Sequence, residues 1–301
     1  MRILVTGATG WIGSALVPQL VAARHHVVAA AVRSTAAAHK VRSLGAVPIR
    51  GDLEDTDSLR RAAEESDGVV HLAYRHDIAF TTDPAGAAET EHRVVTTLGE
   101  ALAGSHRPLV VAAGLAGLPE GSVATETDRA VASGPAGKRI DAAAHALSLA
   151  EHGVRSSVVR LPPTVHGAGD TGFVPRLIDL ARRTGISAYM GDGANRWPAV
   201  HRLDAARVFH VAAEHAEPGS TLHAVAEEGV PFRRLAERIA AHLDIAPASL
   251  NADAAAEHFG EFAGLAGGDF PASSVMTRKR LDWSPSEPAL VDDLEGGGYF
   301  P

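Results

Sequence analysis

The chain has 301 residues, of which 46% are hydrophobic, 21% are charged and none is cysteine. A chain of this size buries a large core, and without cysteine it has no disulfide, thiol nucleophile or cysteine metal site. The formal net charge of −8 disfavours nucleic-acid or anionic-membrane partners. No apolar segment is long enough to span a bilayer and none is typical of a signal peptide, so we expect a cytoplasmic protein.

The first predicted elements are a strand, a glycine-rich turn and a helix within residues 2–17. Gly7, Gly10 and Gly13 form the turn between the apolar strand and the amphipathic helix. Gly7 can adopt a backbone angle closed to other residues, Gly10 lets a pyrophosphate approach the main chain, and Gly13 lets the helix lie close to the strand. The free N–H groups of a helix start attract phosphate. This region predicts a dinucleotide site.

Strand and helix patterns then alternate, which predicts an α/β fold with a doubly wound parallel sheet. The expected strands are 27–32, 47–49, 69–72, 109–112 and 157–159, and the expected helices include 85–103 and 137–152. The alternation weakens beyond Pro163, where we expect helices at 173–183, 231–243 and 251–267 and short strands at 189–190 and 222–225. We therefore assign residues 1–165 to a dinucleotide-binding core. Residues 166–301 form mainly a substrate-binding cap, with some segments returning to the core.

The glycine spacing, preceded by Thr6, resembles that of the short-chain dehydrogenase/reductase superfamily. Four later segments, at 51–53, 67–73, 159–167 and 200–206, agree with it in order. The chain is similar to the extended or atypical branch, which includes NAD-dependent epimerases, dehydratases and related reductases. This resemblance implies a Rossmann core with a small C-terminal cap and a bound nicotinamide dinucleotide.

The choice of nicotinamide cofactor depends on the residues after the second strand. There the chain has Arg33 and Ser34 and no carboxylate, which favours the 2′-phosphate of NADP(H), although NAD(H) stays possible. Asp52 is expected either at the adenine or as the cap of the next turn. The resemblance implies a cofactor site made of Gly7, Thr9, Gly10, Trp11, Ile12, Gly13, Arg33, Ser34, Asp52, Leu53, Leu72, Ala73, Tyr74, Ala112, Leu161, Pro162 and Val165.

The catalytic residues of the resembled enzymes are a tyrosine, a lysine one helical turn later and a serine or threonine. This sequence departs from that pattern, because its only tyrosines are Tyr74, Tyr189 and Tyr299. Lys138 stands approximately where the tyrosine is expected, and Ala142 stands at the lysine position. The strand at 109–112 is followed by no hydroxyl residue, and Ser133 is nearby in sequence. The departure puts the usual carbonyl–alcohol chemistry in doubt and leaves the dinucleotide prediction intact.

Replacement residues are sought among polar and aromatic side chains near the expected crevice. We take Tyr74, Lys138 and His201 as the catalytic candidates. The substrate-binding candidates are His76, Lys138, His166, Phe173, Trp197, His201 and Met276. The alternatives are a pocket wall for Tyr74, structural packing for the histidines and a buried ring that pins a loop for Trp197. We identify no metal-binding cluster among the 16 histidines.

Three functions are consistent with this sequence. The first is an atypical NADP(H)-dependent oxidoreductase acting on a small, partly apolar carbonyl, alcohol or enone. The second is a non-redox isomerase, dehydratase or cyclase on the same scaffold. The third is a binding protein that senses the dinucleotide. The partner in the first two is a small molecule, and the chain is expected to be a monomer or a homodimer.

Overall fold

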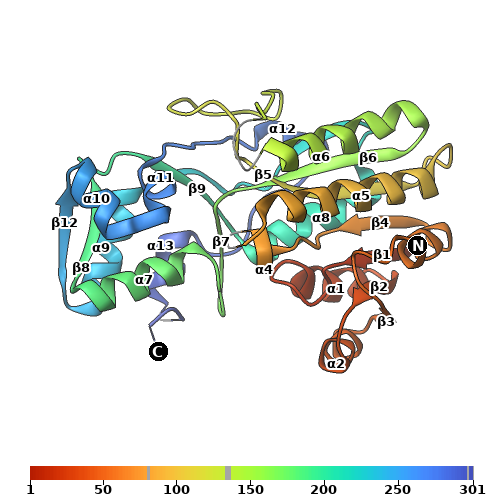
Figure 1. Ribbon diagram of the computed structural model, residues 1–301, viewed down its shortest axis with the longest axis horizontal. Coiled ribbons are helices and arrows are strands. Elements are labelled where there is room, and N and C mark those ends of the chain that lie inside the picture. The colour runs from red at the N-terminus through yellow and green to blue at the C-terminus, as the bar shows by residue number, and fades with distance from the viewer. Residues whose placement is uncertain (80–81, 133–136, 297, 301) are drawn as a thin grey trace.

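A parallel sheet of seven strands organises the computed structural model, which describes residues 1–79, 82–132, 137–296 and 298–300 (Figure 1). The strand order is β10-β6-β5-β4-β1-β2-β3. The strands are β1 (Arg2–Thr6), β2 (His26–Val32), β3 (Val47–Arg50), β4 (Gly68–His71), β5 (Pro108–Gly114), β6 (Arg155–Leu161) and β10 (Ser220–His223). The order reverses between β1 and β4, which is where doubly wound sheets bind ligands.

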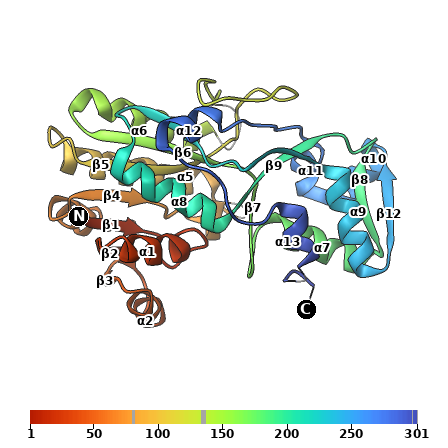
Figure 2. The same ribbon diagram turned by 180° about the vertical axis from the view of Figure 1, so that it is seen from behind.

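Helices cover both faces of this sheet, as the views in Figures 1 and 2 show. One face carries α1 (Gly13–Ala22), α2 (Thr35–Ser43), α8 (Arg202–His215) and α12 (Val275–Leu281). The other carries α3 (Thr56–Glu64), α5 (Pro84–Leu102), α6 (Gly137–Ser148) and the short η1 (Leu149–His152). The central strands are therefore buried on both sides, which explains why they are almost continuously apolar.

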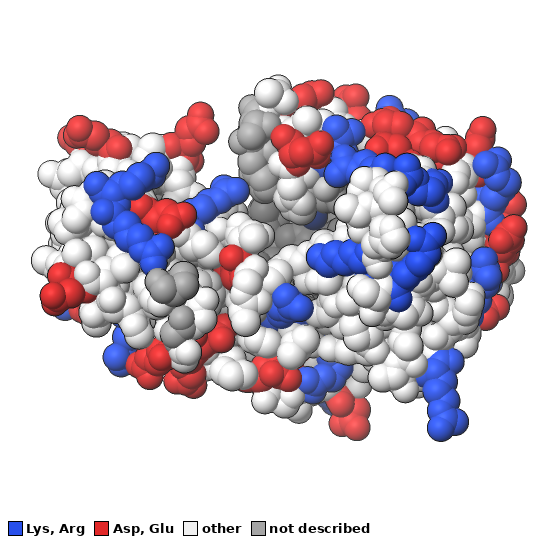
Figure 3. All heavy atoms as spheres, turned by 90° about the horizontal axis from the view of Figure 1, so that it is seen from below, with Lys and Arg blue, Asp and Glu red and all other residues white. Residues whose placement is uncertain are grey.

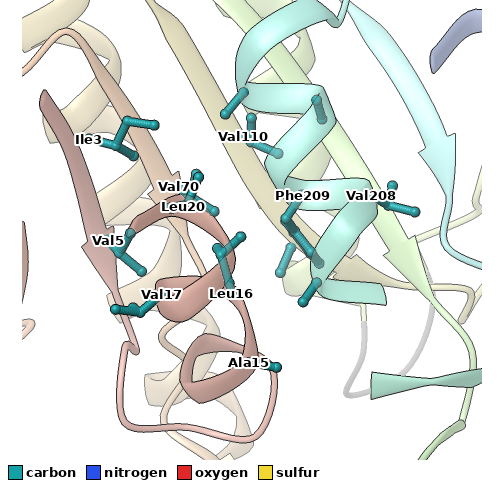
Figure 4. Close-up of a cluster of buried hydrophobic side chains, with 14 of the residues drawn as sticks. Ile3, Val5, Ala15, Leu16, Val17, Leu20, Val70, Val110, Val208 and Phe209 are labelled. Atoms are coloured by element: carbon teal, nitrogen blue, oxygen red, sulfur yellow. The ribbon is translucent and has the colours of Figure 1, made fainter. Parts of the chain in front are cut away.

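The core on the α1 face joins the two halves of the chain. Figure 4 shows Val5 of β1 and Val110 of β5 on the sheet, Leu16 of α1 over it, and Val208 and Phe209 of α8 beside them. Each of these side chains is fully buried, and such burial contributes about 1.5–3 kcal/mol per side chain. Helix α8 belongs by sequence to the second half, yet it completes the core of the first.

A smaller lobe follows β6 and holds most of the remaining elements. Its three-stranded sheet consists of β7 (Thr164–His166), β9 (Arg196–His201) and β11 (Glu227–Pro231), and β8 (Ile186–Met190) pairs with β12 (Ala246–Leu250). Its helices are α7 (Phe173–Thr184), α9 (Phe232–Leu243), α10 (Ala252–Phe259), η2 (Gly260–Phe262), α11 (Ala263–Gly267) and α13 (Leu290–Glu295). An aromatic core of its own fills this lobe.

The fold class expected from the sequence is confirmed, and two of the expected elements need correction. The helix expected at 251–267 is three short pieces, because Gly260 has a φ of +57° and interrupts it. The last strand of the sheet ends at His223, before the expected residue 225. Ser133 lies outside the described residues. In the part of the chain that the structure describes, no helix is long and apolar enough to cross a membrane.

A buried carboxylate joins α8 to the segment that leads into α13. The Asp204 side chain is fully buried and accepts hydrogen bonds from the amides of Ser286 at 3.1 Å and Glu287 at 3.0 Å. The Arg207 guanidinium donates to the same carboxylate at 2.9 Å. Because this one side chain accepts from two backbone amides and a guanidinium, it is a main contact of the junction.

We expect Asp204→Ala to lower the free energy of unfolding by about 3 kcal/mol, because two backbone amides and Arg207 lose their shared acceptor. Urea denaturation measures this change. Asp179→Ala is the control, since Asp179 is exposed and forms a surface ion pair with Arg182, and it should cost less than about 0.5 kcal/mol. Equal losses of unfolding free energy in the two variants would contradict the role of Asp204 at this junction.

Candidate functional site

The glycine turn lies where the carboxyl ends of β1 and β4 meet. Gly7 has a φ of +70°, and a Cβ there would lie 2.8 Å from the amide nitrogen of Ala73. A Cβ on Gly13 would lie 2.1 Å from the Gly7 carbonyl oxygen. A Cβ on Gly10 would meet only that same oxygen, at 3.1 Å. Close backbone packing therefore requires glycine at positions 7 and 13, whereas Gly10 is exposed and has this one tight contact.

The start of α1 presents unpaired amides. The amide of Ser14 donates to the Gly10 carbonyl at 3.0 Å, and no side chain within the described ranges caps the helix. The amides of Trp11, Ile12 and Gly13 find no acceptor in that part of the chain. Open N–H groups at the positive end of a helix fit the pyrophosphate of a dinucleotide. The residues present therefore suit the cofactor that the glycine spacing predicts.

Trp11 connects the glycine turn to the segments that follow β6. Its Nε1 donates to the Val165 carbonyl of β7 at 2.8 Å, and the Arg202 guanidinium at the start of α8 lies 4.4 Å from the centre of its ring. Leu161 ends β6 and Pro162 follows it directly. The wall of the crevice beside the turn is thus fixed by a side chain of the turn itself.

Thr6 and His71 hold the ends of β1 and β4 together. The Thr6 Oγ1 accepts from the amides of Leu72 at 3.2 Å and Ala73 at 3.3 Å and lies 2.7 Å from Nδ1 of His71. Burial and then the charge of Arg139 lower the pKa of His71 to about 4, so the imidazole is neutral and its Nδ1 can accept the hydroxyl proton. This network sets the direction in which the chain leaves β4 toward Tyr74.

Two cations lie near the end of β2. Arg33 is exposed and lies 3.8 Å from Asp77, and Lys40 of α2 donates to the Thr9 carbonyl at 3.0 Å. The Ser34 hydroxyl accepts from the Ala37 amide and caps α2. Lys40 is not among the cofactor residues predicted from the sequence, although its place in the helix after Ser34 is a signal for such a role.

The other expected cofactor residues lie at the same edge of the sheet. Asp52 follows β3 and its Oδ1 accepts from the Glu54 amide at 3.1 Å, which makes a turn, while Asp55 caps α3. Leu53 is buried against the α3 side of the core. Ala112 is buried near the end of β5. Figure 3 shows a hollow in the surface between the smaller lobe and the part of the chain that holds the seven-stranded sheet. Positively and negatively charged side chains are interspersed on that face.

An ionisable cluster follows β4 at this edge. The guanidinium of Arg139, on α6, lies 4.0 Å from the ring centre of Tyr74, and its Nε lies 3.3 Å from Oε2 of Glu91, on α5. The His76 ring meets the Tyr74 ring edge to face at 5.0 Å. A phenol, a cation and a carboxylate are thus brought together from three separate elements.

Burial sets the charges of this cluster. It raises the pKa of Tyr74, against the opposing charge of Arg139, so the phenol stays protonated at neutral pH. Burial also raises the pKa of Glu91 to about 7, although Arg139 acts to lower it. Arg139 and Glu91 are not among the residues predicted from the sequence. An acidic residue among the apolar positions of the helix at 85–103 was the available signal.

Lys138 lies outside this cluster. It is exposed on α6 and pairs with Glu89 of α5. Successive residues of a helix point about 100° apart, so Arg139 faces Tyr74 while Lys138 faces solvent. Arg139, the residue after Lys138, therefore supplies the positive charge near Tyr74. Lys138 makes a surface ion pair with Glu89 and not the predicted catalytic contact.

His166 and His201 form a separate pair in the lobe. His166 is fully buried with its Nδ1 2.9 Å from an Asp293 oxygen, and its ring lies 5.4 Å from that of His201. The Nδ1 of His201 accepts from the Leu203 amide and caps α8. Both histidines thus contact the scaffold, which favours the packing alternative over the catalytic or substrate-binding role.

The aromatic substrate candidates are placed in the core of the lobe. Trp197 is 1% exposed, donates from Nε1 to the Leu265 carbonyl at 3.1 Å and meets Phe173 edge to face at 6.2 Å. This is the buried-ring arrangement and not an open pocket wall. Met276 is half-buried in α12, which packs on β10 and α8, away from these rings.

The raised pKa of Glu91 predicts a pH-dependent stability. The folded chain keeps this proton to about pH 7, whereas the ordinary value is 4.5. The stabilisation is therefore full below pH 4.5 and is lost as the pH rises through 7, a change of about 3 kcal/mol. We expect Glu91→Gln to remove this part of the pH profile, measured by urea denaturation from pH 4.5 to 9.

The control for this measurement is Glu89→Gln. Glu89 lies on the same helix as Glu91, but its carboxylate is exposed. Its profile should run parallel to that of the unchanged chain. If the Glu91→Gln profile runs parallel as well, Glu91 does not carry a displaced pKa.

The fold and the glycine turn define a dinucleotide-binding protein of the short-chain dehydrogenase/reductase type. The profile of the NAD dependent epimerase/dehydratase family matches residues 3–225, and the chain belongs to this family. It is therefore an enzyme of the NAD(P)-dependent epimerase, dehydratase and reductase kind.

Individual relatives agree with this assignment. A protein of Schizosaccharomyces pombe described as uncharacterized is 44% identical over 301 residues, which is 100% of both chains. The 2-alkyl-3-oxoalkanoate reductase of Stenotrophomonas maltophilia is 30% identical, covering 80% of this chain and 75% of that one. The structure of a nucleoside-diphosphate-sugar epimerase from Pseudomonas aeruginosa has a TM-score of 0.78 at 19% identity, covering 100% and 99%, which shows a shared fold.

Proposed function

We propose that this enzyme is an NADP(H)-dependent oxidoreductase that reduces a small, partly apolar carbonyl or enone. The observation that carries the proposal is the contact of Arg139 with Tyr74, directly after β4 and beside the open amides of α1. A relative that is named as a 2-alkyl-3-oxoalkanoate reductase supports a ketone with an alkyl chain as the substrate class.

The roles of the residues follow from their charges. A bound nicotinamide dinucleotide supplies the hydride in such reductions. The protonated phenol of Tyr74 donates a hydrogen bond to the substrate oxygen, where negative charge develops. Arg139 adds positive charge beside that phenol, and Glu91 holds the guanidinium over the ring. This set replaces the tyrosine–lysine pair that the sequence lacks.

The preference for the 2′-phosphate rests on Arg33 and Lys40. Arg33 follows β2 with its guanidinium exposed, and Lys40 contacts the carbonyl of Thr9 in the glycine turn. Both cations can pair with a phosphate on the adenosine ribose, and neither gains from a plain hydroxyl.

We expect calorimetry on nucleotide-free protein to give tighter binding of NADPH than of NADH. Arg33→Ala and Lys40→Ala should each weaken NADPH binding about tenfold, since one charge-assisted contact is worth about 1.4 kcal/mol, and should leave NADH binding unchanged. Arg183→Ala, a basic residue at the exposed end of α7, is the control. Absence of heat with every nicotinamide dinucleotide would refute the proposal, and equal losses for both cofactors would refute the preference.

We expect a panel of 3-oxo acids, ketones, aldehydes and enones to include a substrate whose reduction consumes NADPH, followed by its absorbance. Tyr74→Phe keeps the ring beneath Arg139 and removes the hydroxyl, so kcat should fall about a hundredfold while NADPH affinity holds. Tyr189→Phe, in the cap, should not change kcat.

An unchanged kcat in Tyr74→Phe would leave Tyr74 only as a wall of the crevice. Conversion of a substrate without net use of NADPH would favour the epimerase or dehydratase chemistry that the family also contains. The absence of the expected tyrosine at the start of α6 motivates this alternative. Such a reaction involves no net reduction of the substrate.

A further inference from the structure

Three metal-ligating side chains meet at the end of the sheet remote from the glycine turn. His25 lies in the turn between α1 and β2, and His210 and Glu214 stand one helical turn apart on α8. Oε1 of Glu214 lies 2.8 Å from Nε2 of His25 and 3.5 Å from Nε2 of His210. The ligand atoms of all three residues lie within 4.8 Å of one another. This cluster is not predicted from the sequence, because His25 and His210 are distant along the chain.

The cluster is sheltered, and one of its nitrogens makes no hydrogen bond within the described ranges. The side chains of His25, His210 and Glu214 are 8%, 16% and 27% exposed. Nε2 of His210 is buried and has no hydrogen-bond partner within the described ranges. Burial lowers the pKa of His210, so its imidazole is neutral and keeps a lone pair. A buried nitrogen without a partner is costly unless something binds it.

We infer that His25, His210 and Glu214 bind a divalent transition-metal ion, of which zinc is the best match. Two imidazole nitrogens and one carboxylate form a ligand set that zinc accepts, with water in the remaining position. The two imidazole rings are 5.8 Å apart and nearly perpendicular, at 89°, and α8 presents its two ligands on one face. The ion replaces the hydrogen bond between His25 and Glu214 with two stronger contacts and gives His210 a partner.

Coordination through Nε2 of His25 places the remaining proton on its Nδ1. The ammonium of Met1 lies 3.3 Å from that Nδ1 and has to turn aside when Nδ1 carries the proton. His215 is exposed and lies 3.6 Å from the other oxygen of Glu214, so it approaches from outside the cluster. The ligand atoms of the three inner residues already lie within 4.8 Å of one another before an ion enters.

The position of the site indicates a structural role. His25 precedes β2, at the amino end of the strands, whereas the glycine turn follows the carboxyl end of β1. The ion therefore joins the α1–β2 turn to α8, which lie on one face of the sheet in Figure 2. Metal binding should stabilise the fold without entering the reaction.

The test uses untagged, full-length protein dialysed against a chelator. Titration with zinc chloride alone should give one ion per chain with a Kd of about 1 µM or tighter. Cobalt(II) in its place should give the visible absorption of a low-coordinate site with nitrogen ligands. Zinc should also raise the melting temperature, and the rise should grow with the logarithm of the free zinc concentration above the Kd.

His210→Ala and Glu214→Gln should each weaken zinc binding at least tenfold and remove the cobalt absorption. His39→Ala, which removes an exposed histidine of α2, should change neither readout. Circular dichroism in chelator confirms that the variants fold, and Glu214→Gln keeps the size of the side chain. Zinc binding that survives both substitutions, or a Kd above about 100 µM, would overturn the inference.

Discussion

The contact between the glycine turn and the end of β4 is the constraint on which the rest of the site depends. Gly7 approaches the backbone of Ala73 so closely that no side chain fits, and Thr6 receives the two amides that follow β4. These contacts fix both the open amides of α1 and the course of the chain toward Tyr74. The phosphate site and the ionisable cluster are therefore set by the same few backbone atoms.

The ionisable cluster of Tyr74, Arg139 and Glu91 places a cation beside a phenol without the usual tyrosine–lysine pair. Glu91 is buried at a position where desolvation opposes its ionisation, and Arg139 compensates only partly. The same Arg139 faces the ring of Tyr74. One cation thus serves a carboxylate and a phenol at once, so the charges of α5, α6 and the β4 loop depend on one another.

Much of the core could be predicted from the sequence, because its signals are local. The strand, the glycine spacing and the helix of the first segment each have a characteristic pattern, and the alternation up to β6 is regular. The cofactor prediction drew on the same pattern. The helix α8 was not predicted from the sequence. Its apolar side packs against the sheet of the first half of the chain and not against its own neighbours along the chain.

The candidate site was harder to predict, because its residues meet only in three dimensions. Tyr74 was identified from its place after a strand, but Arg139 and Glu91 come from two other helices and have no spacing that links them. Trp197 shows the opposite limit. A tryptophan beside polar residues has the same local pattern whether it lines a pocket or, as found here, fills a hydrophobic core.

The place of α8 in the core bears on how the chain can be divided. Val208 and Phe209 cover the strands that carry the glycine turn, as Figure 4 shows, and Asp204 on the same helix holds the segment before α13. A fragment excised at residue 165 would leave that apolar surface open to water. The segment that carries the glycine turn therefore relies on α8, from the second half of the chain, for part of its core.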